Sequence, residues 1–126
     1  RRGLIFSAAV ILLVTVVGFG LAGRYFLSER LWAATHSYVT PATKIGSFGF
    51  VEGSLVWRYR SVTTNYLTLG DPKQAAHFLT NSPPYILIVP TTYLTNLPDT
   101  NGIQFQVRGL DLVKFKFRDL TAIVHP

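Results

Sequence analysis

Acid–base chemistry in this chain would have to start from the acidic residues beyond position 43. General acid–base catalysis needs two titratable groups close enough to share a substrate, and Glu52 with Asp119 is the pair that the sequence leaves open. No spacing requires these two side chains to meet. The other acids have structural explanations, because Asp71 precedes Pro72 at a helix start and both Asp99 and Asp111 fall in turn-like segments.

Metal binding and nucleophilic catalysis have less support. His36, His77 and His125 show neither H-x-x-x-H nor H-E-x-x-H spacing, the patterns that place two imidazoles on one helix face. The chain has no Cys, which excludes disulfides, thiolate metal sites and cysteine nucleophiles. No G-x-S-x-G elbow precedes a helix. We therefore predict no catalytic residue, no metal site and no cofactor within this sequence.

Cationic residues give the clearest candidate for binding. Lys114-Phe115-Lys116-Phe117-Arg118 alternates, so that a strand would place three cations on one face and two phenylalanines on the other. One interpretation is a solvated strand face above a core. The other is a strip that contacts anionic headgroups or a phosphorylated lipid. The residues that we predict for such anionic contacts are Arg58, Arg60, Lys114, Lys116 and Arg118.

The segment from Gly18 to Gly23 matches G-x-G-x-x-G letter for letter. A dinucleotide-binding turn requires a preceding strand and an acidic ribose partner about 20 residues further on. Here the glycines end an apolar run, and neither Glu29 nor Glu52 has that spacing. The favoured interpretation is that Gly18 and Ala22 form a small-residue face on which another helix packs.

The apolar run from Gly3 to Gly23 contains no charged residue and has the roughly 20-residue length of a transmembrane helix. A signal peptide is the alternative, but its apolar region is shorter, roughly 7 to 15 residues. Tyr25, Phe26 and Trp32 predict an aromatic interfacial belt, with the helix leaving the bilayer near Arg24. Basic residues flank the run almost evenly, so the positive-inside rule does not orient it.

Composition limits the other possibilities. The 126 residues are 48% hydrophobic and only 14% charged, which argues against a disordered chain. From residue 33 onward, the sequence contains eight Lys and Arg residues and five acidic ones. This excess is too small and too scattered to predict nucleic-acid binding. The chain has no Met and begins with Arg1-Arg2 directly before the apolar run, which predicts that it is a piece of a longer protein.

Three regions follow from these patterns: a transmembrane helix with an interfacial end at 1–32, a connector at 33–43 and an extramembrane domain at 44–126. The fold class predicted for the domain is α/β, a small mixed sheet with packed helices. Predicted strands are 44–50, 62–69, 85–89, 103–108 and 114–124, with a hairpin turn at 109–111 joining the last two. Predicted helices start near 54, at 72 and at 93.

Three local signals set these elements. Ser54 is a possible helix cap before Leu55 to Arg60, although that segment also fits a strand. Asp71 and Pro72 form a clear helix start, with N-cap and first-turn proline. The run from Tyr85 to Val89 is apolar and β-branched, as in a strand buried on both faces.

The order of segments resembles the C-terminal end of polytopic GT-C glycosyltransferases of the aminoarabinose transferase and protein O-mannosyltransferase-like group. The segments that carry the resemblance are the apolar helix, Gly53-Ser54-Leu55-Val56-Trp57-Arg58-Tyr59 at a helix start, Phe78-Leu79 at a helix end, Pro84-Tyr85-Ile86-Leu87-Ile88-Val89 and Leu120-Thr121-Ala122-Ile123-Val124. They span nearly the whole chain but are patterns of hydrophobic type. Gly53 stands where the family has Pro, and Arg58 interrupts the aromatic pair.

The resemblance implies transfer of a sugar from a polyprenyl phosphate donor to a lipid or protein acceptor, with inversion. It also implies a domain on the non-cytoplasmic side of the membrane, a catalytic Asp in a loop that lies upstream of Arg1, and contacts with other transmembrane helices of the same full-length chain. This fragment alone would then be inactive. The alternative is a non-enzymatic, single-pass membrane protein whose α/β domain binds a partner. A self-contained enzyme would need a buried pair of titratable groups in a pocket.

Overall fold

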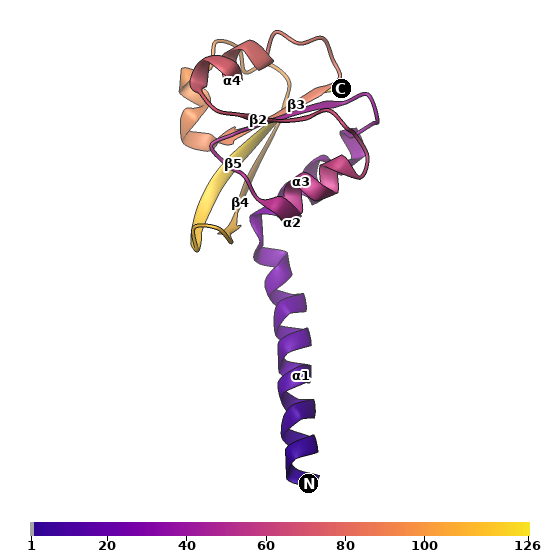
Figure 1. The fold of residues 1–126 in the computed structure, drawn as a ribbon. Helices are drawn as coiled ribbons and strands as arrows, with labels where there is room; N and C mark the ends of the chain where they lie inside the picture. The colour runs from indigo at the N-terminus through magenta and orange to yellow at the C-terminus, as the bar shows by residue number, and fades with distance from the viewer. Residues whose placement is uncertain (1) are drawn as a thin grey trace.

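A computed structural model describes residues 2–126 and shows a long helix that leaves one end of a small α/β head (Figure 1). The helical elements are α1 (Arg2–Ala22), α2 (Leu27–Thr35), α3 (Gly53–Arg60), α4 (Pro72–Phe78) and the 3₁₀ turns η1 (Gly23–Tyr25), η2 (His36–Tyr38) and η3 (Thr91–Asn96). The strands are β1 (Lys44–Phe48), β2 (Tyr66–Leu69), β3 (Tyr85–Pro90), β4 (Ile103–Asp111) and β5 (Lys116–His125). The predicted α/β class is confirmed.

Helix α1 stands clear of the head. It belongs to a segment, Gly3–Tyr25, that is long and apolar enough to cross a membrane, and none of this segment is buried against the rest of the chain. Gly18 and Gly20 lie within the helix with open space beside them. The strand and turn that a dinucleotide site would need are therefore not formed there, because the glycines continue one helix.

The head begins earlier in the sequence than residue 44, the predicted start of the domain, and it includes the predicted boundary between the membrane segment and the connector at residues 32 and 33. That boundary falls inside α2, whose Leu27 and Leu31 are fully buried in the core. Trp32 is half-buried and packs edge-on against Tyr59, with ring centroids 5.4 Å apart, so it contributes to the head. The physical reason is the spacing Leu27, Leu31, Thr35, which gives α2 one buried stripe.

Five strands form one mixed sheet in the order β2-β1-β3-β5-β4. β1 pairs in parallel with β2 and β3, whereas β5 pairs antiparallel with both β3 and β4. β3 lies at the centre, and Tyr85 to Val89 are all buried. This confirms the prediction of a strand covered on both faces. β2 is shorter than the predicted 62–69.

Alternate residues of the sheet enter two separate cores. The proximal face, which α2 and α3 cover, packs Ile86, Ile88 and Leu120 with residues of both helices. The distal face, which α4 and η3 cover, packs Leu87, Val89 and Ile123. Figure 1 shows α2 and α3 on the side from which α1 leaves and α4 on the opposite side.

The helix starts show one correct and one wrong cap. Asp71 accepts a hydrogen bond from the backbone N–H of Gln74 at 2.8 Å and Pro72 opens α4, as predicted. α3 is a helix, but its N-cap is Glu52, and the predicted cap Ser54 lies inside the first turn. The Ser54 hydroxyl instead donates to the Glu52 carboxylate at 2.7 Å. The carboxylate competes successfully for a hydroxyl that would otherwise bond the backbone.

The β4–β5 turn is not where the sequence predicted it. Gly109, Leu110 and Asp111 belong to β4, and the turn is formed by residues 112–115. Gly109 is needed inside the strand, because a Cβ atom there would lie 2.9 Å from the Leu27 Cα and from the Tyr25 carbonyl oxygen. Its small size lets β4 approach the backbone that joins α1 to α2.

Candidate functional site

The five predicted anion-contacting residues do not form one free cationic strip. Arg58 donates two hydrogen bonds to Glu29 Oε1 and one to Oε2 at 2.7–3.0 Å, and Arg118 donates to Asp111 Oδ2 at 3.0 Å. These two guanidinium groups are thus neutralised by carboxylates. Arg60, Lys114 and Lys116 are exposed, and within residues 2–126 none of the three is in an ion pair.

The alternating Lys-Phe segment is only partly a strand. Lys114 and Phe115 lie in the turn, whereas Lys116, Phe117 and Arg118 belong to β5. Phe115 and Phe117 are 83% and 58% exposed. The interpretation that the phenylalanines cover a core is therefore wrong, because both rings lie mainly in solvent.

Asp111 is the anchor of the hairpin end. Its side chain is 2% exposed; Oδ2 binds Arg118, and Oδ1 accepts backbone N–H bonds from Val113 and Lys114 at 2.9 and 3.1 Å. Burial alone would raise the pKa of Asp111, but the Arg118 guanidinium and these two N–H groups outweigh it and hold the pKa below its usual range. Arg118 also donates to the Gly49 carbonyl at 3.0 Å, which ties the hairpin to the loop after β1.

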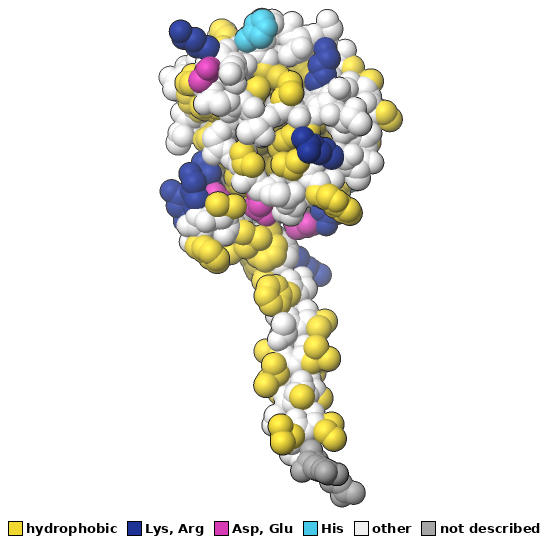
Figure 2. All heavy atoms as spheres, viewed as in Figure 1, with side chains coloured by type: hydrophobic (Ala, Val, Ile, Leu, Met, Phe, Trp, Pro, Cys, Tyr) yellow, Lys and Arg dark blue, Asp and Glu magenta, His cyan; other side chains and the backbone are white. Residues whose placement is uncertain are grey.

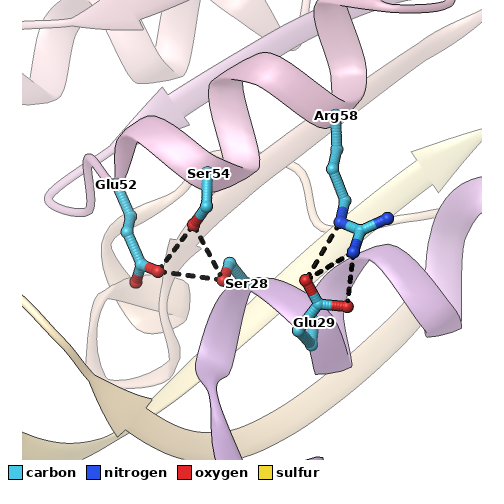
Figure 3. Close-up of polar contacts among 5 residues, drawn as sticks. All are labelled: Ser28, Glu29, Glu52, Ser54 and Arg58. Atoms are coloured by element: carbon cyan, nitrogen blue, oxygen red, sulfur yellow. Dashed lines mark hydrogen bonds and ion pairs between the residues drawn. The ribbon is translucent and has the colours of Figure 1, made fainter. Parts of the chain in front are cut away.

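A second polar cluster lies between α2 and α3 (Figure 3). Glu52 Oε1 accepts hydrogen bonds from Ser28 at 2.9 Å and from Ser54 at 2.7 Å. Glu52 Oε2 has no protein partner among the described residues. Ser28 and Glu52 are only 1% and 4% exposed, whereas Ser54 lies at the surface, so the Glu52 carboxylate is buried beneath the edge of the cluster. The hydrogen bonds of this cluster join α2 to the start of α3, and we call it the α2–α3 joint.

The acid–base pair left open by the sequence is divided between different environments. Glu52 is buried in the α2–α3 joint, whereas the Asp119 side chain is 58% exposed and faces Arg108 at 4.0 Å. These surroundings do not make a shared pocket. No group of three or more His, Cys, Asp or Glu side chains that could hold a metal ion occurs within residues 2–126.

An elbow hollow of about 610 Å³ lies between α1 and α2. Its lower wall is formed by Phe19, Gly20 and Gly23, and its upper wall includes Arg24 and Arg30. Arg30 also donates to the Arg108 carbonyl, which ties α2 to β4. The Glu29 carboxylate, which binds Arg58, also lines the hollow, so Arg24 and Arg30 share it with one neutralised acid beside the apolar wall.

Sequence reasoning missed the elbow and the Ser28–Glu52 contact for the same reason. The stripe Leu27, Leu31, Thr35 was the available signal for an amphipathic helix, but it follows the apolar run so closely that it reads as its interfacial end. Once α2 is assigned to the head, Ser28 faces α3. Arg24 precedes Ser28 in the sequence and lies just after the end of α1.

A scan against known protein families found no match to this chain. Searches of characterised proteins and of solved structures found none either. The resemblance to GT-C glycosyltransferases therefore stays a prediction from the sequence.

Proposed function

We propose that this chain is the membrane-anchored accessory domain of an integral-membrane glycosyltransferase that transfers a sugar from a polyprenyl phosphate to a lipid or protein acceptor. In this proposal α1 is the last membrane helix, and the head lies on the non-cytoplasmic side. The catalytic residues belong to the part of the protein before Arg1. The segment order described above supports the family, and the elbow supports a lipid phosphate as ligand.

The observation that carries the proposal is the direct coupling of α1 to the head. Between the end of η1 at Tyr25 and the start of α2 at Leu27 there is one extended residue, Phe26. Because Leu27 is fully buried, the head has little freedom to swing away from the helix. This holds Arg24 and Arg30 above the apolar wall of the elbow hollow, where a membrane-embedded polyprenyl chain would bring its phosphate.

The outer surface of α1 supports neighbouring helices from the same full-length chain. Its apolar side chains are exposed all round, so lipid or other helices must cover them. A shallow hollow of about 220 Å³ lies over Gly18 and Ala22, bordered by Val14 and Phe19. Small residues of this kind allow close approach of a second helix.

The first experiment is to read the coding sequence upstream of Arg1 in the same frame. About ten further apolar spans of roughly 20 residues, with an acidic loop after the first, are expected. The absence of such spans would contradict the glycosyltransferase proposal.

The second experiment tests the elbow in the full-length enzyme. Arg24→Gln and Arg30→Gln together are expected to raise the KM for the polyprenyl-phosphate donor about tenfold, with kcat nearly unchanged, because they remove ground-state contacts to the phosphate. Lys73→Gln on α4, also an exposed cation, is the matched control and should change neither constant. An unchanged KM in the double variant would exclude a phosphate site at the elbow.

A second candidate function, a single-pass anchored binding domain, is favoured by one observation. β2 is an edge strand, and beside it a hollow of about 570 Å³ is lined by Leu67, Leu69, His77 and Phe78. Polar residues, among them Asp71, Lys73 and Gln74, also line the hollow, and an edge strand beside such a groove can accept an extended peptide. This function predicts an initiator codon shortly before Arg1 and no further membrane spans.

A further inference from the structure

The end of the β4–β5 hairpin extends beyond the rest of the sheet. β3 pairs with β5 only from Leu120 to His125, whereas β4 continues to pair with β5 down to Asp111 and Lys116. Residues 108–119 therefore form a two-stranded ribbon with a turn, here called the overhang. Its base packs against the rest of the head, through Gly109 beside Leu27 and through Arg118 bound to the Gly49 carbonyl, so the turn and the residues next to it are the part that projects.

The overhang exposes large apolar side chains. Val113 is 65% exposed, Phe115 83% and Phe117 58%. Phe115 also adopts a left-handed backbone conformation, with φ of 48°, which is costly for a bulky residue. The two residues before it, Val113 and Lys114, donate backbone N–H bonds to Asp111.

The overhang lies at the end of the head from which α1 leaves. Leu110 forms a parallel bridge with Phe26, the residue that follows η1, and the turn begins two residues later. Figure 1 shows the closed end of the hairpin pointing toward the α1 side of the head. Figure 2 shows hydrophobic and basic side chains together on this same end. A bilayer that contains α1 would therefore face the turn.

The charges of the overhang suit an anionic membrane surface. Lys114 and Lys116 are exposed and carry no ion pair within the described part of the chain, while Asp111 and Arg118 neutralise each other. Aromatic rings with adjacent lysines are the side chains that settle at the headgroup level. A lysine near an anionic leaflet contributes about 1 kcal/mol of attraction.

We propose that the overhang is a second membrane contact, in which Val113, Phe115 and Phe117 enter the interfacial region of the bilayer that α1 spans while Lys114 and Lys116 bind anionic headgroups. Two attachments, the helix and the turn, then fix the tilt and rotation of the head over the membrane. The inference requires α1 to span a bilayer, but it does not require glycosyltransferase activity, so reading the upstream frame leaves it untouched.

Single-cysteine spin labelling of the whole chain tests the proposal, because the sequence contains no cysteine. Phe115→Cys and, separately, Val113→Cys would carry a nitroxide in nanodiscs of zwitterionic lipid with about a third anionic lipid. Power-saturation measurements then compare the accessibility of the label to oxygen, which enters bilayers, and to a water-soluble nickel chelate. Val14→Cys in α1 and Leu67→Cys, 55% exposed beside α4 on the distal face, are the controls.

We expect the Val14→Cys label deep in the bilayer and the Leu67→Cys label in water. Both hairpin labels should lie at interfacial depth, and their accessibility to the nickel chelate should be several-fold lower than that of the label at residue 67. Hairpin labels as accessible to nickel as Leu67→Cys would overturn the proposal. Labels shielded from both reagents would also overturn it, because a protein partner would then cover the turn. A Val14→Cys label that is accessible in water would show that α1 does not span the bilayer, and this would overturn the proposal as well.

Discussion

The two faces of the central sheet are covered in different ways. On the proximal face, α2 and α3 are held by directional contacts: Ser28 to Glu52, Thr35 to Tyr59 at 2.6 Å, and Arg58 to Glu29. On the distal face, α4 and η3 are held mainly by apolar contacts around Phe78, Leu87 and Val89. Both carboxylates that are buried in the described chain, Glu52 and Asp111, belong to the end of the head that faces α1.

The difference reflects what each face must specify. Apolar burial is not directional, so it constrains the rotation and register of a helix less tightly than hydrogen bonds do. A buried carboxylate with two hydroxyl donors fixes both position and rotation, since a shift leaves polar groups unpaired. α1 is joined to α2 through η1 and the single residue Phe26. Polar contacts that fix α2 therefore also fix the direction in which the membrane helix leaves the head.

The largest effect is expected from Asp111→Ala. This change leaves the nearly buried Arg118 without its carboxylate and two turn N–H groups without an acceptor, which should lower the free energy of unfolding by about 3 kcal/mol. Urea titration of the chain in detergent, followed by Trp fluorescence, measures it. Asp71→Ala on the distal side removes only an exposed N-cap and should cost about 1 kcal/mol. Equal losses in the two variants would mean that Asp111 is no more than a turn residue.

Acid titration gives an independent readout of Asp111. Because its pKa in the folded chain lies below the ordinary value of 3.8, the carboxylate contributes stability above that pH. This contribution is lost as the pH falls from 3.8 through the lower folded-state value. In Asp111→Asn the corresponding part of the acid-induced decline should vanish, whereas Asp71→Asn should retain it.

Paired glycine substitutions sharpen the comparison next. The Cβ of Gly109→Ala meets backbone atoms of Leu27 and Tyr25, which cannot yield without moving the elbow, so we expect a loss of about 3 kcal/mol. The Cβ of Gly46→Ala meets the Phe78 ring at 2.9–3.0 Å, and a side chain can shift, so about 1 kcal/mol is expected. Phe78→Leu should rescue Gly46→Ala. If Gly109→Ala is the milder variant, β4 does not lie against the elbow.

Ser28→Ala should have an intermediate effect. It removes one of two hydroxyl donors to the buried Glu52 carboxylate and should cost about 2 kcal/mol. The control is Thr80→Ala at the end of α4, whose exposed hydroxyl donates to the His77 carbonyl and should contribute less than about 0.5 kcal/mol. Thermal unfolding of both variants measures the difference. A neutral Ser28→Ala would show that the α2–α3 joint is held by packing alone.

The smallest effect is expected from Arg58→Ala. Its ion pair with Glu29 is well aligned, but the two side chains are 40% and 37% exposed, so the pair should contribute about 0.5 kcal/mol and less at high salt. Lys73→Ala on the distal side should change nothing measurable. Unfolding in 0.05 M and 1 M NaCl separates the two variants, and a salt-independent loss above 2 kcal/mol would mark Arg58 as part of the buried joint.

Several elements follow from local sequence alone, and each has a short-range cause. The β-branched run at 85–89 is buried on both faces as expected, and Asp71 with Pro72 starts α4. The turn at 109–111 was mispredicted because glycine usually marks a turn, whereas Gly109 is required by the close approach of Leu27 and Tyr25. That approach joins residues about 80 positions apart, which no local pattern reports.

The candidate site divides in the same way. The sequence by itself determined the charge-free apolar helix and the positions of the basic residues, because both depend on composition and spacing along the chain. Only the tertiary structure decided which cations remain available to bind an anion. Glu29 forms an ion pair with Arg58 and Asp111 with Arg118, while Lys114 and Lys116 stay unpaired among the described residues. Ion pairs and burial depend on distances in space, and these are set when the strands pair and the helices cover them.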